Sequence, residues 1–324
     1  MANKSEIHPP SSTLHPRCIF IAGPTAVGKS EIALALAEKA SGEIISVDSM
    51  QVYRGFDIGT AKPSLVERAR VPHHLIDICD LTENFDAAKF IQLAQKVVEE
   101  IQSRAHMPIF CGGTGLYFKA YLSGLGEAPS ANSELRVELE AAPFETLLKE
   151  LRERDPAAYE KIDKQNPRRV IRAVEVIRLT GKKFSEQRAE WKTAVGDQKS
   201  EVIFALNRTA DDLHARINTR VDEMFRRGLV DETRALLQHG LEQNKTAMQA
   251  IGYRQVVEHW RGKRSLGDTI KEVKIRTRQF AKRQLTWFRR QLDPKWIDLD
   301  PAASPQQCAR EIYDAWAKTV LENQ

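Results

Sequence analysis

The residues most suited to chemistry lie at positions 23–30, which read Gly-Pro-Thr-Ala-Val-Gly-Lys-Ser. This segment fits the G-x-x-x-x-G-K-[ST] phosphate loop, in which backbone N–H groups surround phosphate oxygens, the lysine contacts the outer phosphates and the hydroxyl binds Mg2+. An apolar run at 18–22 precedes it and a helix-forming run at 31–37 follows, as the motif requires. A chance match in a glycine-rich turn is the alternative. We expect a diphosphate or triphosphate at Gly23, Pro24, Thr25, Ala26, Val27, Gly28, Lys29 and Ser30, with Mg2+ on Ser30.

A carboxylate and a hydroxyl are expected beside this loop. The apolar run 44–47 ends in Asp48, and the run 108–111 ends in Gly-Gly-Thr-Gly, which contains Thr114. Ligands of parallel α/β sheets bind at the carboxyl ends of the strands, so both side chains should face the same crevice. An aspartate that caps the next turn, or a tight strand-to-helix turn, is the structural alternative. No strand ends in a Walker B aspartate unless Asp77 or Asp80 serves, which argues against an ATP-hydrolysing motor.

The elements that position these side chains alternate between strands and helices. Strands are predicted at 18–22, 44–47, 75–78, 108–111, 202–206 and 295–299. Helices are predicted from the run 31–37, with Gly42 as its stop, and at 86–104, 211–225, 271–290 and 305–322. This alternation predicts an α/β fold with a doubly wound parallel sheet. On the helix that follows the fifth strand, Arg216 and Arg220 lie one turn apart and could reach the phosphate crevice.

The stretch 127–198 lacks strand character and is predicted to be an inserted helical domain, with 17–126 and 199–324 as the core and 1–16 as a disordered extension. Asn166 is the expected N-cap of its clearest helix, which ends at Gly181. Arg168, Arg169 and Arg172 lie near that N-terminus, where the macrodipole disfavours each cation by about 0.3–1 kcal/mol. An anionic partner such as a phosphate backbone would explain them; a solvated charged face is the alternative.

The segment 271–290 is strongly basic, because eight lysines and arginines accompany a single acid, Glu272. A long basic helix is typical of nucleic-acid binding. Val273, Ile275, Phe280 and Trp287 could be its buried stripe.

The remaining composition excludes several classes of protein. The net charge of +5 permits a nucleic-acid partner without requiring one. The four cysteines are scattered and show neither zinc spacing nor a disulfide framework. No apolar run approaches the roughly 20 residues of a membrane span, and the N-terminus does not read as a signal peptide. We expect a cytoplasmic monomer that does not enter the membrane.

Together these segments resemble the tRNA dimethylallyltransferase, or tRNA isopentenyltransferase, family. The resemblance rests on five motifs in order, at 23–30, at 46–53 with 57–63, at 112–117, at 250–254 and at 277–284. The chain lacks the C-terminal Cys2His2 zinc finger of eukaryotic members, so it resembles the compact bacterial form.

The resemblance implies a P-loop NTPase-like fold and transfer of a dimethylallyl group from dimethylallyl diphosphate to N6 of the adenosine 3′ of a tRNA anticodon. Asp48 would take the proton of the amine, Thr114 would orient it, and Lys29, Arg216 and Mg2+ would stabilise the leaving diphosphate. The implied contacts with the anticodon stem-loop are Asp48, Ser49, Met50, Gln51, Thr114, Arg136, Arg168, Arg169, Val170, Ile171, Arg172, Gln249, Ala250, Ile251, Gly252, Tyr253 and Arg254.

Three other functions share part of this pattern. A P-loop small-molecule kinase would use the same loop, with Asp48 as base for an acceptor hydroxyl, but would leave the basic helices unexplained. A prenyltransferase acting on free adenine nucleotides would not need the inserted domain. A non-catalytic RNA-binding protein would leave the phosphate loop without a role.

Overall fold

The computed structural model describes residues 18–125, 129, 132–189 and 202–322. The predicted N-terminal extension, 1–16, therefore lies outside the described residues. The chain divides into two compact units, one made of Met1–Lys119 with Ser200–Gln324 and the other of Ala120–Lys199.

Within the described residues, six parallel strands form one sheet in the order β3-β2-β4-β1-β5-β6. The strands are β1 Ile19–Ala22, β2 Gly42–Val47, β3 His73–His74, β4 Met107–Gly112, β5 Ile203–Asn207 and β6 Lys295–Asp298. Because β1 lies between β4 and β5, the loop that follows β1 opens at the centre of the sheet edge. The α/β class with a parallel sheet is confirmed.

Helices cover both faces of this sheet. Ile19 and Ile21 of β1 share a core with α1 (Lys29–Ala40), α10 (Ala210–Arg226) and α14 (Pro305–Glu322). Side chains alternate along a strand, so Phe20 faces the other side, where its ring stacks on Phe110 with centroids 4.8 Å apart. On that side α3 (Ala87–Ser103) lies against β4, and the Asp86 side chain caps it by accepting from Lys89 N.

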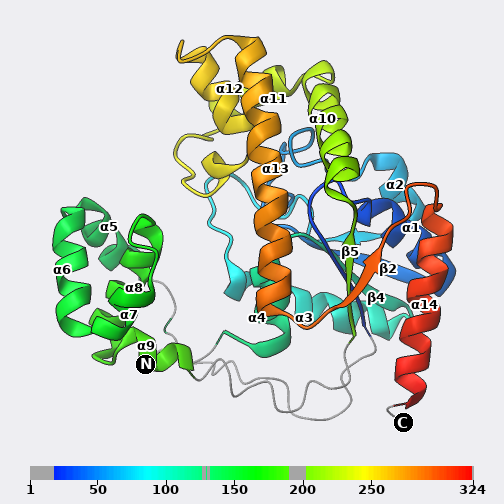
Figure 1. Cartoon of the computed structure of the whole chain (residues 1–324), viewed down its shortest axis with the longest axis horizontal. Helices are drawn as coiled ribbons and strands as arrows, with labels where there is room; N and C mark the ends of the chain where they lie inside the picture. The colour runs from blue at the N-terminus through cyan, green and yellow to red at the C-terminus, as the bar shows by residue number, and fades with distance from the viewer. Residues whose placement is uncertain (1–17, 126–128, 130–131, 190–201, 323–324) are drawn as a thin grey trace. The chain divides into compact units, whose positions relative to one another are not determined.

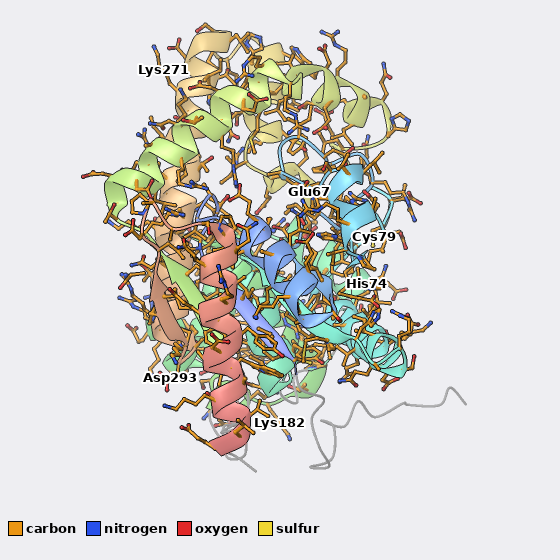
Figure 2. The ribbon with its side chains drawn as sticks, turned by 90° about the vertical axis from the view of Figure 1, so that its right-hand side faces the viewer. Glu67, His74, Cys79, Lys182, Lys271 and Asp293 are labelled. Carbon is orange, nitrogen blue, oxygen red and sulfur yellow. The ribbon has the colours of Figure 1, made fainter. Side chains whose placement is uncertain are left out.

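The long helix α13 (Leu266–Gln291) connects the sheet with a group of smaller helices. Figure 1 shows it in orange, with α12 (Tyr253–Trp260) near one end and α4 (Gly115–Ser123) near the other. Figure 2 labels Lys271, in the second turn of this helix, and Asp293, two residues beyond its end. The group also contains α11 (Leu229–Gln238) and the short 3-10 helix Ala247–Gln249, which both contact α12. A further short helix, α2 (Leu65–Arg70), lies in the segment between β2 and β3.

Two local predictions were wrong. The third strand is His73–His74 rather than 75–78, because Leu75 and Asp77 adopt left-handed φ angles of 60° and 56° that end the strand. The first helix ends at Ala40 and is capped by Ser41, which takes the left-handed conformation, whereas Gly42 begins β2. A Cβ at Gly42 would lie 2.8 Å from Met107 O, so close strand packing explains this glycine.

The second unit has its own core. Its helices are α5 Ser133–Ala141, α6 Phe144–Arg154, α7 Pro156–Lys161, α8 Pro167–Thr180 and α9 Phe184–Ala189. The described residues of this unit form helices and connecting turns, packed around Leu147, Leu151 and Val174. Helix α8 begins after Asn166, whose side chain accepts from Arg169 N, and ends at the left-handed Gly181, as predicted.

Among the described helices, none is both long enough and apolar enough to cross a bilayer. The four cysteines are buried and free.

Candidate active site

The segment 23–30 forms a loop between β1 and α1. Val27 N and the Lys29 ammonium both donate to Pro24 O, at 3.4 and 2.7 Å, and close the turn. Gly28 has a φ of 106°, which favours glycine, and directly precedes α1. Burial lowers the pKa of Lys29 to about 8, while the neighbouring Cys111 and Asp48 act in the opposite direction. The loop therefore holds a partly desolvated cation at a helix N-terminus, where an anion is stabilised.

Arginines bind the outer side of this loop. The predicted Arg216 donates from Nε to Ala26 O at 2.9 Å, and Arg208 donates from Nε to Val27 O at 2.8 Å. Burial and the charge of Arg216 lower the pKa of Arg220, one turn further along α10. Arg208 was not predicted, although it follows the carboxyl end of β5, where ligands of a parallel sheet are expected. The cations around the loop suit a diphosphate.

Asp48 and Thr114 come together at the ends of β2 and β4. Asp48 Oδ1 accepts from Met50 N at 2.8 Å and from Gln51 N at 3.2 Å, so this aspartate does cap the turn that follows it. Ser49 N donates to Thr114 Oγ1 at 3.3 Å. One oxygen of Asp48 thus shapes the loop, and its carboxylate acts electrostatically on Lys29. The capping role and a chemical role are compatible.

A buried glutamine that was not predicted as a site residue joins these loops. Gln284 of α13 accepts from Thr25 N and donates to Gly113 O, each at 2.8 Å. The residue belongs to the motif at 277–284, but its spacing along a basic helix gives no sign of these contacts.

The segment after β2 is held by α11 and α12. Gln51 Oε1 accepts from Ser46 Oγ at 2.9 Å. Tyr253 accepts from Gly59 N at 3.0 Å and donates to Glu232 Oε1 at 2.6 Å. A Cβ at Gly59 would lie 2.4 Å from the Tyr253 ring, so this glycine permits the close approach. Tyr253 is therefore a structural anchor.

The predicted tRNA contacts at 249–254 differ in how far their side chains are buried. Tyr253 and Ala250 are buried, and Ile251 is half-buried against the main core, so their side chains stabilise the fold. Gly252 is buried with a φ of 98° just before α12. Gln249 and Arg254 are exposed, and the proposed contacts of this segment come down to these two side chains.

The predicted contacts on the helical unit also divide into two groups. Arg136 and Arg172 bind the fully buried carboxylate of Glu175, and Arg172 also donates to Pro129 O at 2.7 Å. Val170 is fully buried and Ile171 packs against the unit's core, so their side chains are structural. Arg168 and Arg169 are exposed on the first turn of α8.

The donor set at the loop fits Mg2+ bound chiefly through phosphate. Ser30 is exposed in the first turn of α1, next to Lys29. Mg2+ commonly takes one or two protein oxygens together with phosphate oxygens and water. The two Walker B candidates already form ion pairs: Asp77 with Lys62 and Arg68, and Asp80 with Arg54. No cluster of three acidic, histidine or cysteine ligands exists among the described residues.

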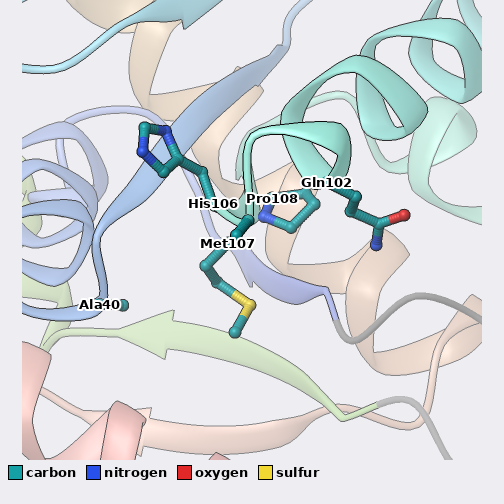
Figure 3. A pocket seen from close by; sticks show the side chains of 6 residues that line it. Ala40, Gln102, His106, Met107 and Pro108 are labelled. Atoms are coloured by element: carbon teal, nitrogen blue, oxygen red, sulfur yellow. The ribbon is translucent and has the colours of Figure 1, made fainter.

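One hollow of the structure lies away from this chemistry. It has a volume of about 300 Å3 and is lined by Ala40, Gln102, Ala105, His106, Met107 and Pro108 (Figure 3). Met107 begins β4, whereas Gly112 at the other end of the strand adjoins the loop with Thr114. The hollow therefore lies at the opposite edge of the sheet.

Residues 51–291 match the IPP transferase family. The tRNA dimethylallyltransferase of Geobacter sulfurreducens is 44% identical over 287 residues, covering 87% of this chain and 92% of the relative. That of Levilactobacillus brevis is 42% identical over 313 residues, covering 95% and 99%.

Solved structures of the same family are also similar to this chain. The tRNA isopentenylpyrophosphate transferase of Bacillus halodurans superposes with a TM-score of 0.69 at 38% identity, covering 96% of this chain and all of that one. A eukaryotic dimethylallyltransferase acting on tRNA gives a TM-score of 0.79 at 29% identity, covering 96% and 80%.

Proposed function

The chain belongs to the IPP transferase family of tRNA dimethylallyltransferases, and from this premise we propose how its residues carry out the transfer. The chain has the P-loop NTPase-like fold of that family and transfers a dimethylallyl group to tRNA. The donor in our proposal is dimethylallyl diphosphate, and the acceptor is N6 of the adenosine 3′ of the anticodon.

The observation that carries this proposal is the meeting of a phosphate loop with a carboxylate at one edge of the sheet. In the proposed reaction a bond forms between N6 and C1 of the prenyl group, while the bond from C1 to the diphosphate oxygen breaks. The amine loses a proton as its new bond forms, and Asp48 accepts it. Thr114, tied to Ser49, orients the amine.

Negative charge grows on the diphosphate as it leaves. Lys29 and Arg216, which lie on or against the phosphate loop, would stabilise that charge. Removing one preorganised donor of this kind typically costs about 3–4 kcal/mol of transition-state stabilisation. Mg2+, held by Ser30 and the diphosphate, would supply Lewis-acid assistance. Because no phosphoryl group is transferred, a Walker B carboxylate is unnecessary.

The acceptor base must leave its stack to reach this edge of the sheet, at a cost of a few kcal/mol. Exposed cations would offset that cost through phosphate contacts. In our proposal these are Arg168 and Arg169 of α8, together with Arg254 and the exposed part of α13. We propose that the protein does this as a cytoplasmic monomer.

The decisive experiment offers labelled dimethylallyl diphosphate and Mg2+ to bulk tRNA, followed by digestion to nucleosides. The proposal expects an N6-prenylated adenosine and one released pyrophosphate for each adduct. Label that appears instead on free AMP, ADP or ATP would favour nucleotide prenylation. ADP formed from ATP and a small acceptor would favour a kinase.

A further inference from the structure

The amide of Gln284 connects two loops that are far apart in the sequence. Its Oε1 accepts from Thr25 N of the phosphate loop, and its Nε2 donates to Gly113 O, directly before Thr114. Both distances are 2.8 Å, and the residue is only 7% exposed. One buried side chain thus spans the gap between the proposed diphosphate site and the residue proposed to orient the acceptor.

The surrounding packing fixes α13 against the second of these loops. A Cβ at Gly113 would lie 2.3 Å from Gln284 Nε2, and a Cβ at Gly115 would lie 2.1 Å from the Trp287 ring. The Phe288 ring meets Phe118 edge-on, with centroids 6.4 Å apart. The helix therefore lies close against this loop, and a side chain at Gly115 would collide with the Trp287 ring.

The contact requires a group that donates and accepts at once, on opposite sides. A neutral amide does so, whereas an ionised carboxylate only accepts and a thioether does neither usefully. The bond to Thr25 N also takes one backbone donor away from the phosphate and fixes the edge of the loop. The chemistry of the side chain, more than its volume, therefore determines the geometry between the loops.

We propose that Gln284 is a positioning residue that sets the distance between the diphosphate and the acceptor amine. This inference rests on the proposed function in one respect, namely that both loops serve a single transfer reaction. Gln284 touches neither reactant and acts through Thr25 and Gly113. Loss of the bridge should therefore lower kcat more than it raises the KM of either substrate.

The test exploits the two protonation states of Gln284→Glu. A protonated glutamic acid offers one O–H donor and one carbonyl acceptor, which restores both bonds. The ionised form keeps the bond from Thr25 N but repels Gly113 O. Burial raises the pKa of a carboxyl group, so the change should fall within a workable range. We expect the ratio of variant to wild-type kcat to be near one at about pH 5.5 and to fall roughly 100-fold towards about pH 9.

Two control variants separate this effect from general damage. Gln284→Met removes both bonds at similar volume and should lower kcat by a similar factor at every pH. Gln306→Glu adds the same charge at an exposed position of α14, away from the proposed site, and should leave the ratio near one throughout. Thermal unfolding of each variant at both pH limits establishes that it is folded.

A flat ratio for Gln284→Glu, or a wild-type kcat for Gln284→Met, would overturn the positioning role. A Gln284→Met variant that changes only KM would do the same, because it would assign the residue to binding. If wild-type protein forms no prenyl adduct, the proposed function fails and takes this role with it. If wild-type protein is active and the ratio is flat, only the role of Gln284 fails.

Discussion

Asp48 illustrates how one side chain can serve both fold and chemistry. Its Oδ1 accepts two backbone N–H groups, from Met50 and Gln51, and so holds the turn after β2. In our proposal the other oxygen, Oδ2, takes the proton of the acceptor amine. The two tasks can be separated by a substitution that keeps the acceptor and removes the base.

We expect Asp48→Asn to lower kcat by about 10²- to 10⁴-fold while tRNA affinity and stability change little. The amide oxygen of asparagine still accepts from Met50 and Gln51, so the turn survives, but the neutral group cannot serve as a base. Single-turnover prenylation, filter binding of tRNA and thermal unfolding would measure the three quantities. Asp48→Ala removes the cap as well and should also destabilise the protein. Parallel losses of tRNA binding and rate in Asp48→Asn would make the residue structural.

Site residues that belong to a local motif could be predicted from the sequence. Those whose contacts join positions far apart in the chain could not. Lys29 and Asp48 follow strands directly, so a local motif and the sheet-edge rule identified them as candidates. Arg208 contacts Val27 across 181 positions, and Gln284 contacts Thr25 across 259. Tertiary packing decides such contacts, and the residue type alone does not reveal them.

At the scale of elements, the Glu43 side chain forms hydrogen bonds with three residues at the sheet edge that lies away from the active site. This carboxylate on β2 is 2% exposed and accepts from Arg104, beyond α3, at 2.9 and 3.0 Å. It also bonds His74 Nε2 of β3 at 2.6 Å and His106 Nδ1 at 2.7 Å. Burial alone would raise the pKa of Glu43, but these hydrogen bonds outweigh it and bring the pKa to about 2.

Glu43→Gln should destabilise the protein by about 3 kcal/mol at neutral pH. The folded pKa lies below the ordinary value of 4.5, so the stabilisation is complete above about pH 4.5 and is lost as the pH falls towards 2. The difference between wild type and variant in urea unfolding should therefore shrink over that interval. Glu38→Gln, which breaks an exposed pair with Arg70, is the matched control and should change stability by at most about 1 kcal/mol. A difference that does not depend on pH would contradict this account.

Tyr253→Phe tests the attachment of the loop after β2 to α11 and α12. The change removes a hydroxyl that accepts from Gly59 N and donates to Glu232, in a fully buried position. We expect a loss of about 1–2 kcal/mol in urea unfolding. Tyr313→Phe, at a partly buried position of α14, makes the same chemical deletion and should cost less than about 0.5 kcal/mol. Equal losses of stability in the two variants would show that the hydrogen bonds of the Tyr253 hydroxyl do not stabilise the fold.

Most elements could be predicted from periodicity, and the exceptions have physical causes. The third strand was misplaced because left-handed residues at 75 and 77 interrupt an apolar run. On α13 the alternative of a buried stripe holds for Val273 but not for Ile275 and Phe280, which are 42% and 37% exposed. The buried positions of α13 include Gln284, because this part of the helix packs against polar backbone at the active site.

At the scale of the whole molecule, counting charges overstates the surface available to RNA. On α13, Lys274 pairs with Asp222 of α10 at 2.6 Å, and Arg276 pairs with Glu272 at 2.7 Å. On the helical unit, two of the predicted arginines, Arg136 and Arg172, pair with the buried carboxylate of Glu175. Arg169 and Arg172 lie three positions apart on α8. Replacing Arg169 should therefore affect tRNA binding, whereas replacing Arg172 should affect stability.

Arg169→Ala should weaken tRNA binding by about tenfold and make the dependence of log K on log salt about one unit less steep, with stability unchanged. Arg169 is exposed on the first turn of α8, where the macrodipole gives a cation no stabilising role in the helix. Arg172→Ala should instead cost about 2 kcal/mol of stability. This is less than the roughly 3–5 kcal/mol of an unpaired buried charge, because Arg136 still binds Glu175.

Titrating tRNA binding against salt for both variants, with Lys149→Ala as a control, separates the two roles. Lys149 lies on α6 of the same unit, and its side chain is 76% exposed. Its replacement by alanine removes one positive charge, as the two arginine substitutions do. If net charge alone governed the interaction, all three variants would lose the same slope. If α8 contacts the phosphate backbone through its first turn, only Arg169→Ala makes the salt dependence of tRNA binding less steep. Arg172→Ala instead shifts the unfolding midpoint. An unchanged slope for Arg169→Ala would remove this helix from the proposed tRNA interface.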